Sequence, residues 1–225
     1  MLRTGVAVVL AFAPSLVRAQ ALSLTTAIAS GDCTGTSFNQ AADASGKFLA
    51  AEWAGAGQFP VAINRGRVRC SIRFNVTVPA GYRIVVGGGN AVATRMAIAQ
   101  LSPLRLNGTT SRALAETAVS IDGGMTTSAT AATSGGVMTS ASLAQDRSAT
   151  APSVESACAS ATKTSFVIGA VLDVATASNY VVPWPPEPYA ERETASMSSV
   201  RLFYGVVSCA PTRTAVPQAE VLVRP

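Results

Sequence analysis

The sequence predicts an all-β protein: a mostly antiparallel β-sandwich with two disulfides and a long Ser/Thr/Ala-rich central region that forms a loop or a sheet edge. Three observations support this prediction. Apolar and polar residues alternate from Val68 to Val78, the period-two pattern of a strand with one face in a core. Other strand-like runs recur without a long helical pattern between them. Four cysteines occur in a chain that begins like a secreted protein.

Residues 1–19 have the features of a cleaved secretory signal peptide. A short basic start precedes an apolar run interrupted by Pro14, and small residues follow where a signal peptidase cuts. A retained anchor is the alternative, although the run is short for a membrane span. Without residues 1–19 the chain has 15 basic and 12 acidic residues, which lowers its formal net charge from +5 to +3. So small a charge does not favour nucleic acid as a partner.

The remaining chain, about 205 residues, is the size of one β domain. We assign residues 20–30 to an N-terminal lead, 31–210 to a single β-sandwich domain and 211–225 to a C-terminal tail. No segment after the signal is long and apolar enough for a membrane helix. We therefore expect a protein of the extracellular space or the cell wall.

The first half of the domain consists of strands separated by turns. The expected strands are residues 47–53, 67–78 and 82–86. Glycine, proline and aspartate mark turns and loops at residues 31–35, 43–46, 55–60, 79–81 and 87–89. Residues 96–106 are apolar and fit either a helix or a strand, although Pro103 argues against a helix interior.

The second half begins with a stretch that is poor in large apolar residues. Residues 120–160 are dominated by Ser, Thr, Ala and Gly, so they cannot build a core of their own. We expect a long loop or thin edge strands there, with an O-glycosylated segment as the functional alternative. Two clear strands follow at 165–174 and 199–207, and a proline-rich extended loop at 183–189 lies between them.

The four cysteines predict two disulfides, because a secreted chain is exposed to an oxidising environment. Three pairings are open. We favour Cys33–Cys70 and Cys158–Cys209, since each pairs a loop or strand end with a nearby strand and places one bridge in each half.

The residue types present exclude several kinds of catalytic site. The chain has no histidine, which excludes Ser-His-Asp and Cys-His catalysis and the usual transition-metal sites, and no cofactor or metal motif is present. Ser160-x-x-Lys163 matches the bare pattern of serine acyl-enzymes but lacks its companion motifs, so we attribute it to chance. A glycoside hydrolase needs only two carboxylates. No local pattern selects a pair among the acids, which include Glu52, Asp122, Asp173 and Glu187.

Two sets of side chains form a candidate ligand surface. Arg67, Arg69 and Arg73 share the solvent face of one strand and could hold an acidic polysaccharide or a phosphate. The alternative is that they protect the sheet against pairing with other chains. Trp184 and Tyr189 in the proline-rich loop could stack on sugar rings, or could instead cover the core.

Two N-glycosylation acceptor sequences are present, at Asn75 (Asn75-Val76-Thr77) and at Asn107 (Asn107-Gly108-Thr109). These two sites can be modified only if the organism that makes the protein glycosylates its secreted proteins.

The cysteine-bearing segments resemble a family of small secreted four-cysteine proteins of unknown function, found in fungi, plants and actinobacteria. The resemblance is carried by the segment 31–33, by the segment from Arg67 and Cys70 to the Val-Pro-Ala-Gly-Tyr turn at 78–82, and by the positions of Cys158 and Cys209. The Ser/Thr/Ala-rich stretch stands where that family has a Tyr/Phe-rich strand. The resemblance implies secretion and a β fold, and it supplies no catalytic residue.

These observations predict a non-enzymatic secreted β domain, associated with a cell wall or matrix, that binds an extracellular polysaccharide or a protein. The alternative is a carbohydrate-active hydrolase that uses a carboxylate pair.

Overall fold

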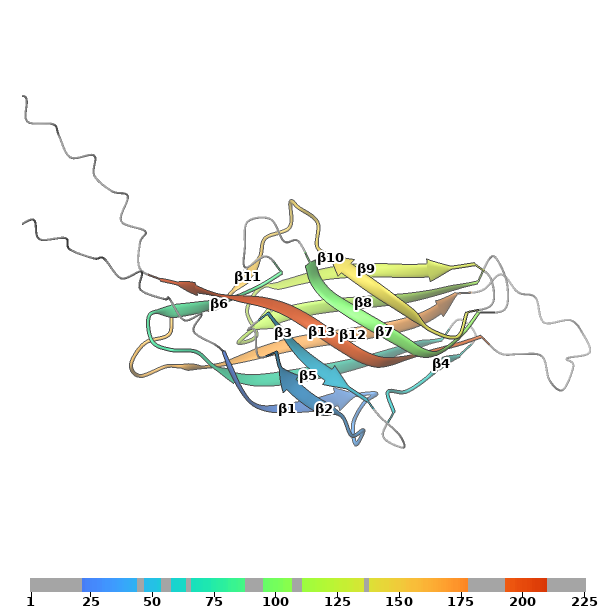
Figure 1. Ribbon diagram of the computed structural model, residues 1–225, viewed down its shortest axis with the longest axis horizontal. Coiled ribbons are helices and arrows are strands. Elements are labelled where there is room, and N and C mark those ends of the chain that lie inside the picture. Colours follow the sequence, from blue (N-terminus) through green and yellow to red (C-terminus); the bar gives the residue numbers. More distant parts are fainter. Residues whose placement is uncertain are drawn as a thin grey trace, which may run out of the picture.

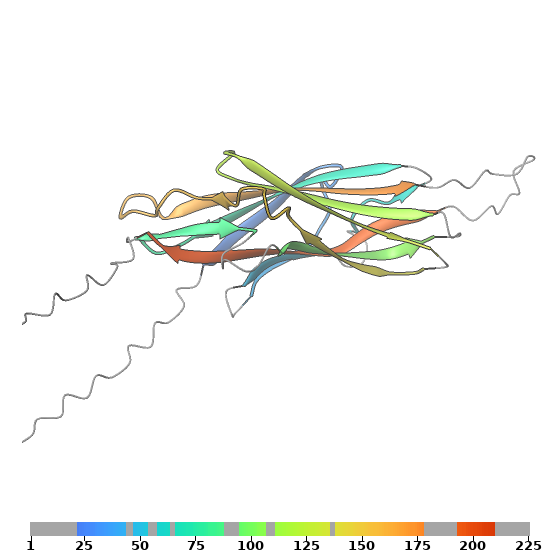
Figure 2. The same cartoon turned by 90° about the horizontal axis from the view of Figure 1, so that it is seen from above.

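The chain folds into two β-sheets packed face to face. The computed structural model describes residues 22–43, 47–53, 58–63, 66–87, 95–106, 111–135, 138–177 and 193–209. Thirteen strands are found in this part of the chain, and every pairing between them is antiparallel. The two layers are separated in the edge-on view (Figures 1 and 2). The predicted all-β sandwich is therefore confirmed.

The first layer is a five-stranded sheet. Its spatial order is β1 (Ser23–Gly31), β5 (Arg67–Thr77), β12 (Ser165–Ala177), β8 (Arg112–Ile121) and β9 (Thr126–Ser134). The central strands β5 and β12 are in register from Ser165 opposite Thr77 to Ala175 opposite Arg67. Residues far apart in the sequence thus lie side by side in one sheet.

The second layer is an eight-stranded sheet built around β13 (Thr194–Ser208). Its main path runs β10 (Ala141–Asp146), β7 (Arg95–Arg105), β13, β3 (Phe48–Glu52) and β2 (Asn39–Ala42), and the short strands β4 (Ala62–Ile63), β6 (Tyr82–Val86) and β11 (Val154–Glu155) complete it. Strand β13 is 15 residues long, so it pairs with β7 on one side from Thr194 to Leu202, with β4 and β3 on the other side, and with β6 from Tyr204 to Ser208.

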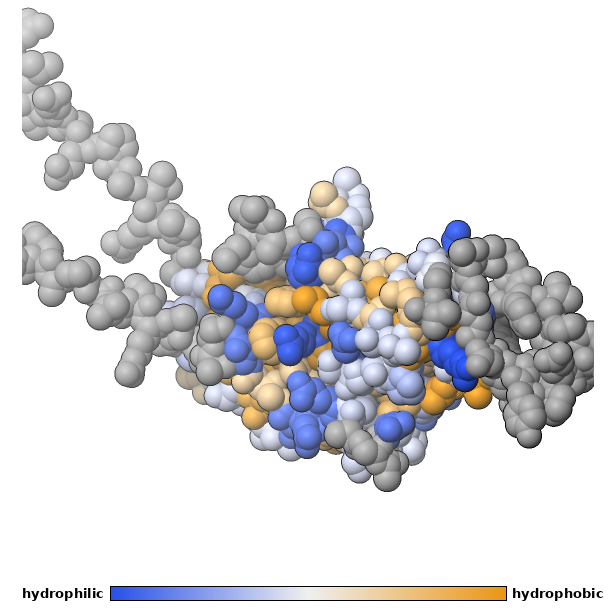
Figure 3. Space-filling view, turned by 45° about the vertical axis from the view of Figure 1, so that its right-hand side comes forward, coloured by the Kyte–Doolittle hydropathy of each residue, from blue (hydrophilic) through white to orange (hydrophobic). Residues whose placement is uncertain are grey.

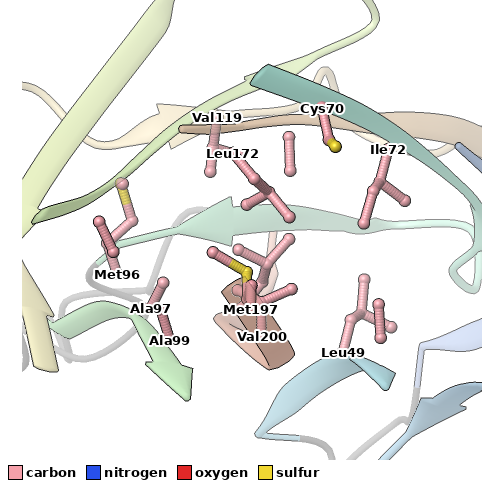
Figure 4. Close-up of a cluster of buried hydrophobic side chains, with 14 of the residues drawn as sticks. Leu49, Cys70, Ile72, Met96, Ala97, Ala99, Val119, Leu172, Met197 and Val200 are labelled. Carbon is pink, nitrogen blue, oxygen red and sulfur yellow. The ribbon is translucent and has the colours of Figure 1, made fainter. Parts of the chain in front are cut away.

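The hydrophobic core fills the space between the two sheets. Figure 4 shows Ile72, Val119 and Leu172 of the five-stranded sheet facing Leu49, Met197 and Val200 of the eight-stranded sheet. Each of these six side chains is at most 1% exposed. Burial of this apolar surface, worth about 25 cal/mol per Å², is the main force that holds the two layers together.

Two disulfides are present, Cys33–Cys70 and Cys158–Cys209, with Cα–Cα distances of 5.3 and 6.1 Å. The pairing favoured from the sequence is therefore confirmed. Cys33 and Cys70 are completely buried, whereas Cys158 is exposed and Cys209 is half-buried. Two disulfides indicate an oxidising environment.

Three segments acquire structure that the sequence left open. Most of the expected N-terminal lead is strand β1, which pairs with β5 along the edge of the five-stranded sheet. The ambiguous segment 96–106 is mostly strand β7, with Pro103 exposed near its end. The Ser/Thr/Ala-rich stretch forms β9 and β10 at sheet edges and the short strand β11, so its edge-strand interpretation is the right one. In the described part of the chain, no helix is long and apolar enough to cross a membrane.

Candidate functional site

The outer face of the five-stranded sheet carries the polar half of the alternating β5 pattern. Cys70, Ile72 and Phe74 point into the core and are fully buried, so Arg69, Ser71 and Arg73 between them point outward. The structure therefore places Arg67, Arg69 and Arg73 on one open sheet face, as predicted.

Two of these three arginines are bound to acids of the same sheet. Arg67 Nη2 lies 2.7 Å from Asp173 Oδ2 on β12 and 3.5 Å from Glu116 Oε2 on β8, and Arg69 Nε lies 3.9 Å from Asp173 Oδ2. The hydrogen bond from Arg67 to Asp173, and then the charge of Asp173, raise the pKa of Arg67 above its ordinary value. The Asp173 side chain is only 5% exposed beneath the two guanidinium groups. The positive charge of Arg67 and Arg69 is therefore largely neutralised within the sheet.

Arg73 differs from its two neighbours because it has no acidic partner among the described residues. Its cross-strand neighbours are Ile28 on β1, which is 60% exposed, and Gly169 on β12. Gly169 has no side chain, and a Cβ built there would lie 3.1 Å from Ser120 Oγ on β8. Arg73 is thus flanked across the sheet by an exposed apolar side chain on β1 and by a glycine on β12, and Ser120 Oγ of β8 lies close to that glycine.

A hollow of about 210 Å³ lies at the end of the same face, next to the position of Arg73 on β5. Its lining comes from β1, β5, β12 and the turn after β8, and consists of Thr25, Asn75, Val76, Asp122, Ser165, Phe166 and Val167. Asn75 is two residues from Arg73 on the same side of β5, a rise of about 6.6–6.8 Å. Asn75 Nδ2 donates a hydrogen bond of 2.7 Å to Thr26 Oγ1, which fixes the amide at the edge of the hollow.

Asp122 forms the opposite side of the hollow and is held by two hydrogen bonds. Its Oδ1 accepts the Val167 backbone N–H at 2.8 Å, and its Oδ2 accepts Lys163 Nζ at 2.8 Å. Burial alone would raise the pKa of Asp122, but the hydrogen bonds from Lys163 and Val167 and the charge of Lys163 outweigh it and lower the pKa. Asp122 is therefore a fixed, ionised acceptor at neutral pH.

These contacts also decide the role of the Ser160-x-x-Lys163 motif. The Lys163 ammonium is paired with Asp122, and the Lys163 backbone N–H donates to Ser160 Oγ at 3.1 Å. With its ammonium bound to Asp122, Lys163 is not placed as the general base that a serine nucleophile needs. The motif therefore closes a turn, in agreement with its interpretation as a chance match.

The outer side of the eight-stranded sheet has a different character. The rings of Phe48 and Phe203 pack edge to face with centroids 5.9 Å apart, and the Arg201 guanidinium lies 5.3 Å from the Phe48 ring centroid. In the view of Figure 3, hydrophilic and hydrophobic residues are interspersed over the surface. Arg201 is exposed like Arg73 but is stacked on an aromatic ring.

Several predicted site residues lie outside the described part of the chain: Trp184, Tyr189, Glu187 and Asn107. Of the remaining acids named from the sequence, Glu52 lies on β3 in the other sheet, far in the topology from Asp122 and Asp173. In the described residues, no group of three His, Cys, Asp or Glu side chains could hold a metal ion.

Sequence reasoning missed the acid cluster and the hollow. Asp173 and Glu116 become neighbours only through the register of β12 against β8, which cannot be read from the sequence. The one signal in the sequence was Asp173 itself, an acid in an otherwise apolar stretch, because such a residue needs a polar or charged neighbour.

The comparisons with known proteins add little to this geometry. No family model and no curated protein sequence matches the chain. A solved structure described as TmCBM61 in complex with beta-1,4-galactotriose is similar over 81% of this chain and 88% of its own, with 11% sequence identity. Its TM-score of 0.27 is too low to carry an argument about fold or ligand.

Proposed function

We propose that this chain is a secreted, non-catalytic domain that binds an acidic polysaccharide on the outer face of its five-stranded sheet. It would belong to the family of small secreted four-cysteine proteins that its cysteine segments resemble. The observation that supports the proposal best is Arg73, an arginine without an acidic partner in the described residues, which lies close along β5 to a hollow lined with hydrogen-bonding groups.

The surroundings of Arg73 suit an acidic sugar. A guanidinium binds a carboxylate through paired N–H donors, and such charge-assisted hydrogen bonds are the strong ones. The hollow offers the Asn75 amide, the Asp122 carboxylate and the Ser165 hydroxyl, which can bond sugar hydroxyls. Val167, which is half-buried and lies opposite Asn75, can contact the apolar face of a sugar ring.

The paired arginines extend the same surface. The side chains of Arg67 and Arg69 are 57% and 66% exposed, so each keeps N–H donors that face solvent although it contacts Asp173. Arg69 and Arg73 are four residues apart on β5, a rise of about 13 Å. A polymer with repeated carboxylates that ran along β5 would meet both.

A binding experiment with matched variants tests this proposal. The purified protein is titrated with polygalacturonic acid and, as the uncharged comparison, with neutral galactan, at low and high salt. We expect binding to the acidic polymer that weakens with salt, because exposed charges are screened. Arg73→Gln should weaken binding about tenfold or more, since it removes a charge-assisted bond.

Arg201→Gln is the matched control, because it removes one exposed arginine from the opposite sheet and changes the net charge equally. It should leave affinity almost unchanged. If both variants weakened binding equally, the loss would come from the lower net charge alone, and the ligand would not bind on the outer face of the five-stranded sheet. Absence of binding to any acidic polysaccharide would reject the proposal.

The hydrolase alternative has one arrangement in its favour. Asp173 and Glu116 are cross-strand neighbours on β12 and β8, a pair of carboxylates on one face. However, both contact Arg67, and Asp173 is almost completely buried beneath it. Two carboxylates that are both bound by one arginine are not free to act on a glycosidic bond. Release of reducing ends from the same polysaccharides, lost in Asp173→Asn, would favour the hydrolase over the binding domain.

A further inference from the structure

The glycosylation acceptor Asn75 lies at an unusual place for such a residue. An acceptor sequence usually indicates a surface loop, whereas Asn75 lies inside β5, which is paired with β1 on one side and with β12 on the other. Its backbone cannot turn away from the sheet. A glycan on Asn75 must therefore lie over the outer sheet face.

The hydrogen bond of Asn75 leaves room for attachment. The amide has two N–H groups, and one of them donates to Thr26 Oγ1. In N-glycosylation, Nδ2 forms a bond to the anomeric carbon of a sugar on a lipid-linked pyrophosphate donor. The bond from that carbon to the phosphate oxygen breaks, and Nδ2 loses one proton. The second N–H can keep its bond to Thr26, so the sheet edge need not change.

The hollow is the space nearest to an attached sugar, because Asn75 is part of its lining. At about 30 Å³ per water, its volume of about 210 Å³ corresponds to about seven waters, which is room for a sugar ring. Its lining includes the hydroxyl groups of Thr25 and Ser165, the Asp122 carboxylate and the half-buried Val167.

An attached sugar would also reach the position proposed for the ligand. Asn75 and Arg73 are alternate residues on one face of β5, about 6.6–6.8 Å apart along the strand. The first sugar would fill the hollow, and the next would pass over Ile28, Arg73 or Gly169, which form the adjacent row of the sheet.

We infer that a glycan on Asn75 and an acidic polysaccharide compete for the same part of the sheet, so that glycosylation of Asn75 prevents ligand binding. This inference rests on the proposed function. It makes the unglycosylated protein the binding form and the glycosylated protein a form with its ligand face covered.

The test compares proteins made in a host that performs N-glycosylation. Thr77→Ala removes the Asn75 acceptor sequence but keeps the Asn75 side chain, whereas Thr77→Ser keeps the acceptor sequence and is the matched control. Thr109→Ala removes only the second acceptor sequence. Intact mass gives the occupancy of each site, and titration with polygalacturonic acid gives the affinity.

We expect Thr77→Ala to bind at least tenfold more tightly than wild type or Thr77→Ser carrying the Asn75 glycan, with Thr109→Ala close to wild type. Equal affinity of the glycosylated and unglycosylated forms would overturn the inference, as would a mass showing that Asn75 is never modified. If Thr77→Ala binds no acidic polysaccharide at all, the proposed function itself fails, which is a different result from equal binding.

Discussion

The two disulfides should contribute unequally to stability, because they differ in burial more than in loop length. They join residues 37 and 51 positions apart. In the chain-entropy description these separations correspond to about 3.8 and about 4.1 kcal/mol at 25 °C, which are almost equal. Replacing Cys33 and Cys70 by alanine also removes two completely buried sulfurs, which should cost about 1–2 kcal/mol more. Cys158 is exposed, so replacing the Cys158–Cys209 bridge removes little buried surface and adds little to the loss of stability.

We therefore expect Cys33→Ala/Cys70→Ala to lose about 5–6 kcal/mol of unfolding free energy and Cys158→Ala/Cys209→Ala about 4 kcal/mol. For a chain of this length, each kcal/mol lowers Tm by about 2–4 °C, so both losses are well within reach of calorimetry.

Urea unfolding followed by tryptophan fluorescence, with calorimetry as a second method, measures both variants. Trp53 is a suitable probe because it is 5% exposed and packs against Phe59 with ring centroids 5.1 Å apart. A larger loss for the exposed Cys158–Cys209 bridge would refute the argument from burial. A loss below about 1 kcal/mol for either variant would refute the entropic estimate.

Three further predictions concern single side chains. Burial, and then the charge of Asp43, raise the pKa of Tyr204 above its ordinary value of 10.0. In urea titrations, wild type should therefore lose stability as the pH rises above 10.0, whereas Tyr204→Phe should not. At neutral pH Tyr204→Phe should be as stable as wild type or more stable by about 1 kcal/mol, because the buried hydroxyl has no hydrogen-bond partner in the described structure; a clear loss would reveal a missed partner. Because the pKa of Asp122 is lowered on folding, its carboxylate stabilises the folded protein. This stabilisation is complete above the ordinary pKa of 3.8 and is lost as the pH falls through the pKa of the folded state. The difference in Tm between wild type and Asp122→Asn should therefore shrink from pH 5 to pH 2, and a constant difference would contradict this. Gly169→Val adds a branched side chain opposite Arg73, against Ser120 Oγ, and should weaken polysaccharide binding in the titration described above; an unchanged affinity would place the ligand elsewhere on the sheet.

The sequence predicted those strands whose alternation uses large side chains. In β5 the inward residues include Ile72 and Phe74, so the period of two is visible without any structure. In β9 the inward residues are Thr127, Ala129 and Ala131, which are too small to produce a hydrophobic pattern. Such a strand is held by its pairing with β8, which is a property of the sheet and not of the local sequence.

Strand β1 was missed for a related reason. Its pairing with β5 shifts register between Leu24 and Thr26, so the alternation breaks in the middle of a short segment. Such a bulge adds one residue and reverses the apparent inward face beyond it. The strand becomes visible only against its partner.

The candidate site was predicted in part. The outward direction of Arg67, Arg69 and Arg73 follows from the alternation alone, but their difference in charge pairing does not. That difference depends on Asp173, which is about a hundred residues away in the chain and becomes a neighbour through the register of β12. The hollow likewise joins residues from four separate segments, which only the fold brings together.

The position of β13 has a consequence for how the chain folds during synthesis. Among the thirteen strands of the described residues it comes last in chain order, yet it lies between β7 and β3 in the centre of the eight-stranded sheet. Likewise β12, the strand before it, pairs with β5 and joins it to the rest of the five-stranded sheet. Neither layer can therefore close until the C-terminal third has left the ribosome, and pairings between such distant segments form slowly. Throughout that interval Asn75 belongs to an open chain, so an enzyme that modifies it would act before the sheet face exists.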